Sequence, residues 1–316
     1  MESKAEYISP LLPGSSGAAR SGTLFTTPMK PSESPQTAPL QQNWKLTLAY
    51  DGTDFRGWQV QPDETTVQGE LQAALGRITG ETPLPQGSGR TDAGVHALAQ
   101  VASFALAASI PPANLHRALN RTLPPAIRIL EAKTVPETFH ARHSARAKTY
   151  EYRIFPGEIC PPFLARYAYA CVWPMDVEAM ERAAQAFLGE HDFLSFAASD
   201  PDLTTRNLAS AHEASQEFQA PTAVRTIHSS GWEPRVTEAG DLLVYRVRGS
   251  GFLHHMVRNL VGTMLDVGRG HFRADAMPEI LAARNRSAAG PTAPARGLFL
   301  HSVEYDEQAE LLPKDL

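Results

Sequence analysis

Between residues 44 and 305, segments whose apolar residues recur with the period of a strand are followed by segments whose apolar residues recur with the period of a helix. Residues 44–50 alternate apolar and polar side chains up to the turn at Asp51-Gly52. Residues 67–78 then repeat apolar side chains at helical spacing as far as Gly80. The same order of strand, helix and strand returns after residue 147, without a residue-level repeat. Strands interspersed with helices, but without regular βαβ units, predict an α+β fold around a mainly antiparallel sheet.

The two periods place individual elements along the chain. A capping box at Thr65–Gln68 begins the first helix, and Asp176 caps a later one. Helices are predicted at 67–79, 114–120, 177–188 and 253–264. Strands are predicted at 44–50, 98–104, 126–130, 148–155, 224–232, 242–248 and 298–305.

Net charge alone argues against a nucleic-acid partner, because the 316-residue chain carries a formal charge of -5. The charge is unevenly distributed, however. Residues 140–153 hold four Arg and Lys residues against one acid, and residues 245–273 hold five arginines against one acid. With Tyr150 and Tyr152 interleaved, these clusters fit a phosphate-lined groove with stacking rings, and they equally fit two solvated faces.

Residues 1–42 contain six prolines and seven serines, a composition that predicts a disordered extension. The chain start lacks the basic region of a secretory signal, and no apolar run approaches the roughly 18 residues that span a bilayer. Cys160 and Cys171 lack metal-ligand spacing and fit two reduced thiols. We therefore expect a cytoplasmic protein with no membrane segment.

The segment Gly87–His96 places a carboxylate, Asp92, close to Arg90 and among three glycines. Glycines let the backbone adopt positive φ and let a bulky substrate approach closely, as an active-site loop requires. An ordinary polar turn has a similar composition. Residue types alone leave both interpretations open.

The string Gly-Arg-Thr-Asp-Ala-Gly-Val-His at 89–96, followed by Gln100–Phe104, closely resembles the catalytic motif of the TruA family of tRNA pseudouridine synthases. The resemblance implies that Asp92 is the nucleophile, with Arg90 as a substrate-binding neighbour. Residues 251–259, Gly-Phe-Leu-His-His-Met-Val-Arg-Asn, are similar to a second family motif whose arginine, here Arg258, contacts the catalytic aspartate.

Residues 147–152, Ala-Lys-Thr-Tyr-Glu-Tyr, are similar to a third motif, whose tyrosine, here Tyr150, stacks on the target uracil. The segment 297–300 matches the closing segment of the family, and the match implies that Leu298 shapes the uracil pocket. Without the resemblance, Tyr150 is more often a core residue than a ligand contact, as aromatic residues on strands usually are. Arg258, which lies off the apolar stripe of its predicted helix on the side of His254, reads as a solvated arginine or one on a cleft wall.

The resemblance covers residues 43–306 and implies the pseudouridine synthase fold, with two related α+β halves and a central cleft. The implied halves are 43–146, with the Asp92 loop, and 147–306, with Tyr150 and Arg258; residues 307–316 form a tail. The implied reaction converts uridine to pseudouridine at tRNA positions 38, 39 and 40, in a homodimer and without a cofactor. Residues 196–226 depart from the family pattern.

Two other site types fit poorly. Gly87-x-Gly89 lacks the third glycine and the βαβ context of a dinucleotide site. His254 and His255, adjacent on a predicted helix, point about 100° apart and do not face one metal easily, and Asp92 with His96 supplies only two ligands. We expect no metal.

Two rival functions remain for comparison. One is a catalytically silent RNA-binding protein on the same scaffold, which would have no need of an intact Asp92, Tyr150 and Arg258. The other is a hydrolase with an aspartyl nucleophile, which would require a second carboxylate or a metal set near the first.

Overall fold

The structure is a computed structural model that describes residues 41–198 and 222–312. Residues 1–40 of the predicted extension lie outside the described residues, as do residues 199–221 of the segment that departs from the family pattern. The first strand begins at Gln42, the last residue of the predicted extension. At the other end, Glu310 of the predicted tail forms ion pairs with Lys45 and Lys133.

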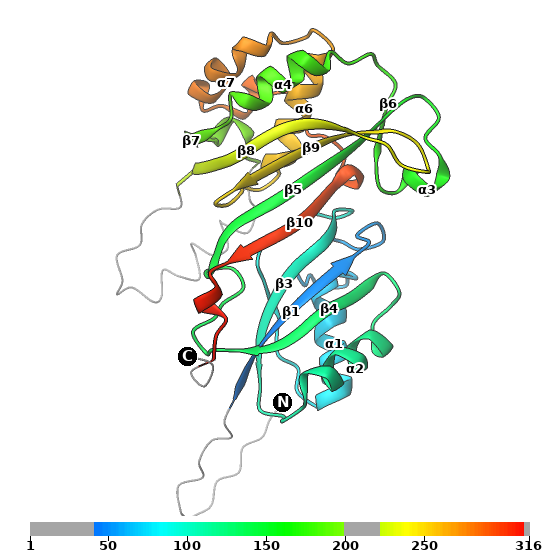
Figure 1. Cartoon of the computed structure of the whole chain (residues 1–316), viewed down its shortest axis with the longest axis vertical. Coiled ribbons are helices and arrows are strands. Elements are labelled where there is room, and N and C mark those ends of the chain that lie inside the picture. Colours follow the sequence, from blue (N-terminus) through cyan, green and yellow to red (C-terminus); the bar gives the residue numbers. More distant parts are fainter. Residues whose placement is uncertain (1–40, 199–221, 313–316) are drawn as a thin grey trace, which may run out of the picture. The chain divides into compact units, whose positions relative to one another are not determined.

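A single sheet runs through the described residues (Figure 1). Its strands follow the order β4-β1-β3-β10-β5-β9-β8-β7, with β2 paired to β3 and β6 paired to β5. The strands are β1 Gln42–Tyr50, β2 Gln86–Gly87, β3 His96–Leu106, β4 Ile127–Val135, β5 Ala145–Pro156, β6 Tyr169–Cys171, β7 Gly189–Asp192, β8 Val224–Arg235, β9 Leu242–Gly249 and β10 Leu298–Tyr305. Most neighbours are antiparallel, whereas β10 lies parallel to β3. The predicted α+β fold with a mainly antiparallel sheet is confirmed.

The helices are α1 Val67–Thr79, α2 Pro112–Thr122, α3 Pro162–Ala165, α4 Val177–Gln185, α6 Met256–Gly268 and α7 Met277–Ala283. Most of them pack on the sheet in two groups (Figure 1). Helices α1 and α2 lie with β1, β3 and β4, whereas α4 and α6 lie with β8 and β9. Among the described residues, no helix combines the length and the hydropathy needed to cross a bilayer.

Local sequence explains most element boundaries. In β1 the alternating residues Trp44, Leu46 and Leu48 are fully buried, as the period of two predicts. Asp176 caps α4 by accepting a hydrogen bond from the amide of Ala179 at 2.9 Å, also as predicted. The predicted strand at 126–130 is wrong in length, because β4 pairs with β1 as far as Val135.

Two helix starts differ from the prediction. The capping box is wrong, because Thr66 caps α1 and the Gln68 side chain bonds Val60 and Pro85 instead. The helix predicted from residue 253 begins only at Met256. The cause is His255, whose φ of 58° lies in the left-handed region, so a right-handed helix cannot include this residue.

The helix predicted at 177–188 is also too long. Helix α4 ends at Gln185, and Phe187 is buried in the core after the helix has ended. Most residues of α6 are buried, and Leu260, Val261 and Met264 are fully so. Because the body of α6 is packed in the core, the polar side chains of its first turn are held in fixed positions.

The carboxylate of Glu151 on β5 anchors a cluster of arginines. Its side chain is 1% exposed and accepts hydrogen bonds from Arg153 at 2.7 Å, Arg235 at 2.7 and 2.8 Å, and Arg246 at 3.0 Å. Burial raises the pKa of Glu151, but the bonds from Arg235, Arg153 and Arg246 outweigh burial and lower the pKa to about 2.

We expect Glu151→Gln to lower the free energy of unfolding at pH 7 by about 3 kcal/mol, because three guanidiniums lose a buried countercharge. The wild-type stabilisation is present above the ordinary carboxyl pKa near 4.5 and is lost as pH falls toward about 2. Urea unfolding between pH 7 and pH 3 measures both effects. Equal stability of the two proteins at pH 7 would contradict the assignment, and Glu64→Gln, at an exposed ion pair with Arg56, is the control.

Candidate active site

The loop between β2 and β3 presents Asp92 and is held from behind by residues 50–58. The amide of Trp58 donates to the carbonyl of Thr91 at 3.0 Å, and the Thr91 hydroxyl bonds the Tyr50 hydroxyl at 2.8 Å. Gly57, with φ of 90°, approaches so closely that an added Cβ would lie 2.5 Å from the Thr91 carbonyl oxygen. The loop is therefore fixed by packing, and its one carboxylate points outward.

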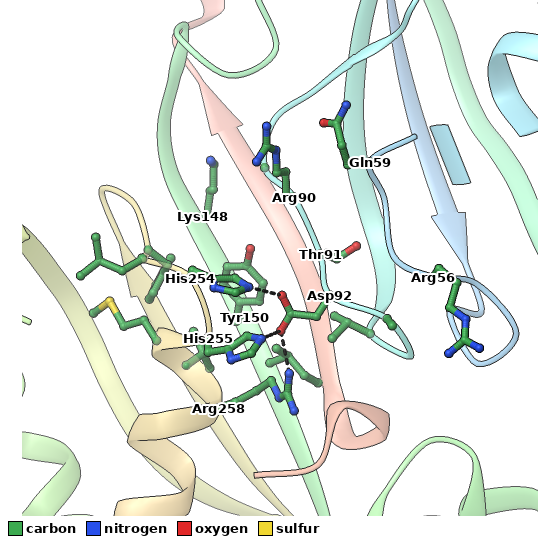
Figure 2. Close-up of a pocket in the computed structure, with 18 of the residues that line it drawn as sticks. Arg56, Gln59, Arg90, Thr91, Asp92, Lys148, Tyr150, His254, His255 and Arg258 are labelled. Atoms are coloured by element: carbon green, nitrogen blue, oxygen red, sulfur yellow. Dashed lines mark hydrogen bonds and ion pairs between the residues drawn. The ribbon is translucent and has the colours of Figure 1, made fainter. Parts of the chain in front are cut away.

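Asp92 faces a cleft of about 870 Å³ (Figure 2). All five residues singled out in the sequence line this cleft, although they come from the β2–β3 loop, β5, α6 and β10. They are Arg90, Asp92, Tyr150, Arg258 and Leu298. The volume falls within the range of small-molecule and nucleotide pockets.

Arg258 lies in the first turn of α6 and reaches across to the loop. Its Nη1 donates to Asp92 Oδ2 at 2.7 Å, and its Nε donates to the Ala293 carbonyl at 2.8 Å. The Arg258 side chain is 15% exposed, so the solvated alternative is wrong. Arg90 lines the same cleft, but its side chain points away from the Asp92 carboxylate (Figure 2). The remote arginine, not the local one, bonds the carboxylate.

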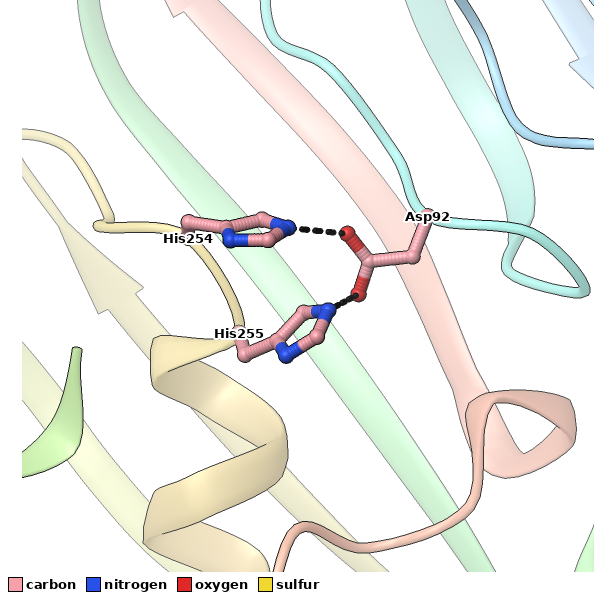
Figure 3. Close-up of side chains that lie close together, drawn as sticks. All are labelled: Asp92, His254 and His255. Atoms are coloured by element: carbon pink, nitrogen blue, oxygen red, sulfur yellow. Dashed lines mark ion pairs between the residues drawn. The ribbon is translucent and has the colours of Figure 1, made fainter. Parts of the chain in front are cut away.

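His254 and His255 both face Asp92 (Figure 3). Their Nε2 atoms lie 3.5 Å from Oδ1 and 3.2 Å from Oδ2, respectively, and their rings lie 3.9 Å apart between centroids with their planes tilted by 34°. The expectation that these side chains diverge is wrong, because both precede α6 and the positive φ of His255 turns the two rings to one side. His96, by contrast, faces Asp51 on the other side of the loop.

Asp92, His254 and His255 could together hold a metal ion, since their ligand atoms lie within 4.8 Å of one another. The Arg258 guanidinium on the same carboxylate opposes a second cation there. Burial lowers the pKa of His255 below its ordinary value, against the opposing effect of Asp92. At neutral pH His255 is therefore mainly a neutral imidazole beside an ionic Asp92–Arg258 pair.

Tyr150 stands on β5 at the floor of the cleft. Its ring packs edge-to-face on Phe252 with 5.0 Å between centroids, and it is 7% exposed. Burial raises the pKa of Tyr150 well above its ordinary value, so its hydroxyl remains protonated at neutral pH. Leu298, the first residue of β10, also lines the cleft.

Lys148 and Phe252, which the sequence placed in a basic cluster and in a family motif without a site role of their own, also line the cleft. Lys148 lies two residues before Tyr150 on β5, and residues two apart on a strand project from the same face. That spacing was the available signal. Phe252 belongs to the 251–259 motif and had no local pattern to distinguish it from a core residue.

Comparisons with known proteins agree with the motifs. The family model described as tRNA pseudouridine synthase matches residues 47–144 and 183–306. Proteins called tRNA pseudouridine synthase A are 51% identical over 261 residues in Solibacter usitatus and 45% identical over 263 residues in Moorella thermoacetica; each match covers 83% of this chain and 98% of the relative. A relative in Bordetella petrii is 43% identical over 272 residues, or 85% of this chain and 94% of its own length. The chain belongs to the TruA family of tRNA pseudouridine synthases.

Proposed function

We propose that this protein isomerises uridine to pseudouridine at positions 38, 39 and 40 of the tRNA anticodon stem-loop, with Asp92 as the nucleophile. The observation that carries the proposal is the 2.7 Å contact of Arg258 with the Asp92 carboxylate inside a cleft floored by Tyr150. The guanidinium holds the carboxylate in place where it faces the cleft, as a nucleophile requires.

In the proposed reaction Asp92 forms a covalent adduct with the nucleotide and the C1′–N1 bond breaks. The uracil then turns, C5 bonds to C1′ while the bond between Asp92 and the nucleotide breaks and frees the carboxylate, the C5 proton leaves and N1 gains a proton. The product is an isomer of the substrate, so no oxidant, reductant or phosphoryl donor takes part. Attack at C1′ and a glycal route both use the carboxylate where the structure places it.

Tyr150 supplies an aromatic face to the flipped uracil in place of its lost stacking partners, a contribution of about 1–3 kcal/mol. Leu298 contacts the same base from β10, and Arg90 contacts the substrate from the loop. Because burial raises the pKa of Tyr150, a phenolate is not readily formed to take the C5 proton. A water molecule in the cleft is the better acceptor.

We further propose that the enzyme acts as a cytoplasmic homodimer, with halves 43–146 and 147–306 flanking the cleft. Tritium release from tRNA labelled at uridine C5 tests the reaction, because only exchange of the C5 substituent frees the label. Substrates with cytidine at 38, 39 or 40 identify the positions. Binding without tritium release would favour the silent RNA-binding protein, and free uracil would favour a hydrolase.

A further inference from the structure

Lys148 has an unusual environment for a lysine in the wall of a cleft. Its ammonium donates to the backbone carbonyl of Ser88. A Cβ built on Gly89 would lie 3.3 Å from Lys148 Nζ and 3.8 Å from the Tyr150 hydroxyl, so both polar groups border the same loop backbone. Figure 2 shows Lys148 at the Arg90 end of the cleft, away from the Asp92 carboxylate.

Arg225, near the start of β8, brings a second cation to this end. Its Nη1 donates to the backbone carbonyls of Thr222 and Val224 at 2.7 and 2.6 Å. An added Cβ on Gly251 would lie 3.6 Å from the Arg225 Nε, which places the guanidinium beside the segment that leads to Phe252. Three separate parts of the chain therefore converge here.

Neither cation has an acidic partner in the described part of the chain. No Asp or Glu oxygen among those residues lies within 4.0 Å of the charged nitrogens of Lys148 or Arg225. Burial, followed by the positive charges of Arg142 and Arg225, lowers the pKa of Lys148 to about 8. Gathering half-buried like charges costs free energy unless an anion neutralises them.

We propose that Lys148 and Arg225 form a phosphate subsite that binds the RNA backbone at or next to the target nucleotide. The inference rests on the proposed function, because it takes the anion to be a phosphate of the RNA. Lys148 lines the same cleft as Asp92, and Arg225 lies beside Gly251, next to the cleft residue Phe252, so a bound phosphate fixes the nucleotide before its base reaches Tyr150. A phosphodiester also supplies the missing charge without adding a protein carboxylate.

Binding should be linked to proton uptake. Free Lys148 is partly deprotonated at pH 8, whereas a bound phosphate favours its ammonium form, so binding takes up as much as about half a proton at that pH. Calorimetry of an anticodon stem-loop RNA in two buffers of different ionisation enthalpy measures this uptake. Lys148→Arg should abolish the uptake and keep the affinity constant to pH 9, since a guanidinium does not titrate there.

Lys148→Gln should weaken stem-loop affinity roughly tenfold at pH 7 and reduce the slope of log affinity against log salt by about one. Arg225→Gln should have a similar effect. Arg117→Gln, at an exposed arginine on α2, is the matched control and should change neither quantity. Unchanged affinity and slope in Lys148→Gln, with wild-type binding that takes up no proton, would overturn the proposal.

The phosphate itself is identified by replacing single phosphates around position 39 with neutral methylphosphonates. At the contacted phosphate, the replacement should weaken wild-type binding clearly more than it weakens binding by Lys148→Gln, because Arg225 alone still contacts that phosphate in the variant. Additive losses at every phosphate would contradict the subsite. If the subsite behaves as expected while wild-type protein releases no tritium, the proposed reaction fails and the subsite stands. Tritium release together with additive losses would instead support the reaction and overturn the subsite.

Discussion

Asp92→Asn should reduce the single-turnover rate of pseudouridine formation by roughly 10⁴-fold or more, because an amide cannot replace a carboxylate nucleophile. The substitution is nearly isosteric, and the remaining carbonyl oxygen can still accept the bond that Arg258 donates at 2.7 Å. Folding and RNA affinity should therefore stay close to those of the wild type. Tritium release with excess enzyme, alongside filter binding of the same tRNA, measures both quantities.

Asp54→Asn is the matched control, since Asp54 is an exposed carboxylate paired with Arg166 outside the cleft. It should leave the rate unchanged. Should Asp92→Asn retain more than about a tenth of the wild-type rate, Asp92 is not the nucleophile. A large loss of RNA affinity in the same variant would instead assign Asp92 to substrate binding.

The alternation of apolar residues predicted most of the sheet. A strand that buries one face shows a period of two within a few neighbouring residues, so the pattern can be read directly from the sequence. The strand at 298–305 was placed correctly, for example, with both ends as observed. The position of β10 between β3 and β5 had no such signal. Parallel pairing of Phe299 with His96 joins residues about 200 positions apart in the chain, and no local pattern encodes it.

Asp92 and its loop could be found from the sequence because glycines around an acid form a compact signal. The two histidines were misjudged for one physical reason. A helical wheel assumes helical backbone at every position. His255 has a φ of 58°, so the wheel gives the wrong directions for the side chains of His254 and His255. Lys148 could be recognised from the sequence only as one member of the basic cluster at 140–153, because its place in the wall of the cleft is a property of the folded chain.

Arg258→Met should lower the single-turnover rate at saturating enzyme by roughly 10²-fold or more, while RNA affinity falls far less. The lost guanidinium bonds one carboxylate at 2.7 Å and one backbone carbonyl at 2.8 Å, so its main effect is on the orientation of Asp92. Methionine keeps the length and apolar stem of the side chain. Arg258→Lys should recover only part of the rate, because a single ammonium cannot reproduce the guanidinium geometry that bonds Asp92 Oδ2 and the Ala293 carbonyl together.

This behaviour separates Arg258 from Lys148, although both are cations in one cleft. A residue that contacts phosphate changes affinity and the salt slope, whereas a residue that orients the nucleophile changes the rate once RNA is bound. The salt dependence of binding in Arg258→Met should accordingly match that of the wild type. An unchanged rate with a slope shallower by about one would place Arg258 on the RNA backbone instead. Asp92 would then depend for its orientation on the imidazoles of His254 and His255, whose Nε2 atoms lie 3.5 and 3.2 Å from its carboxylate oxygens.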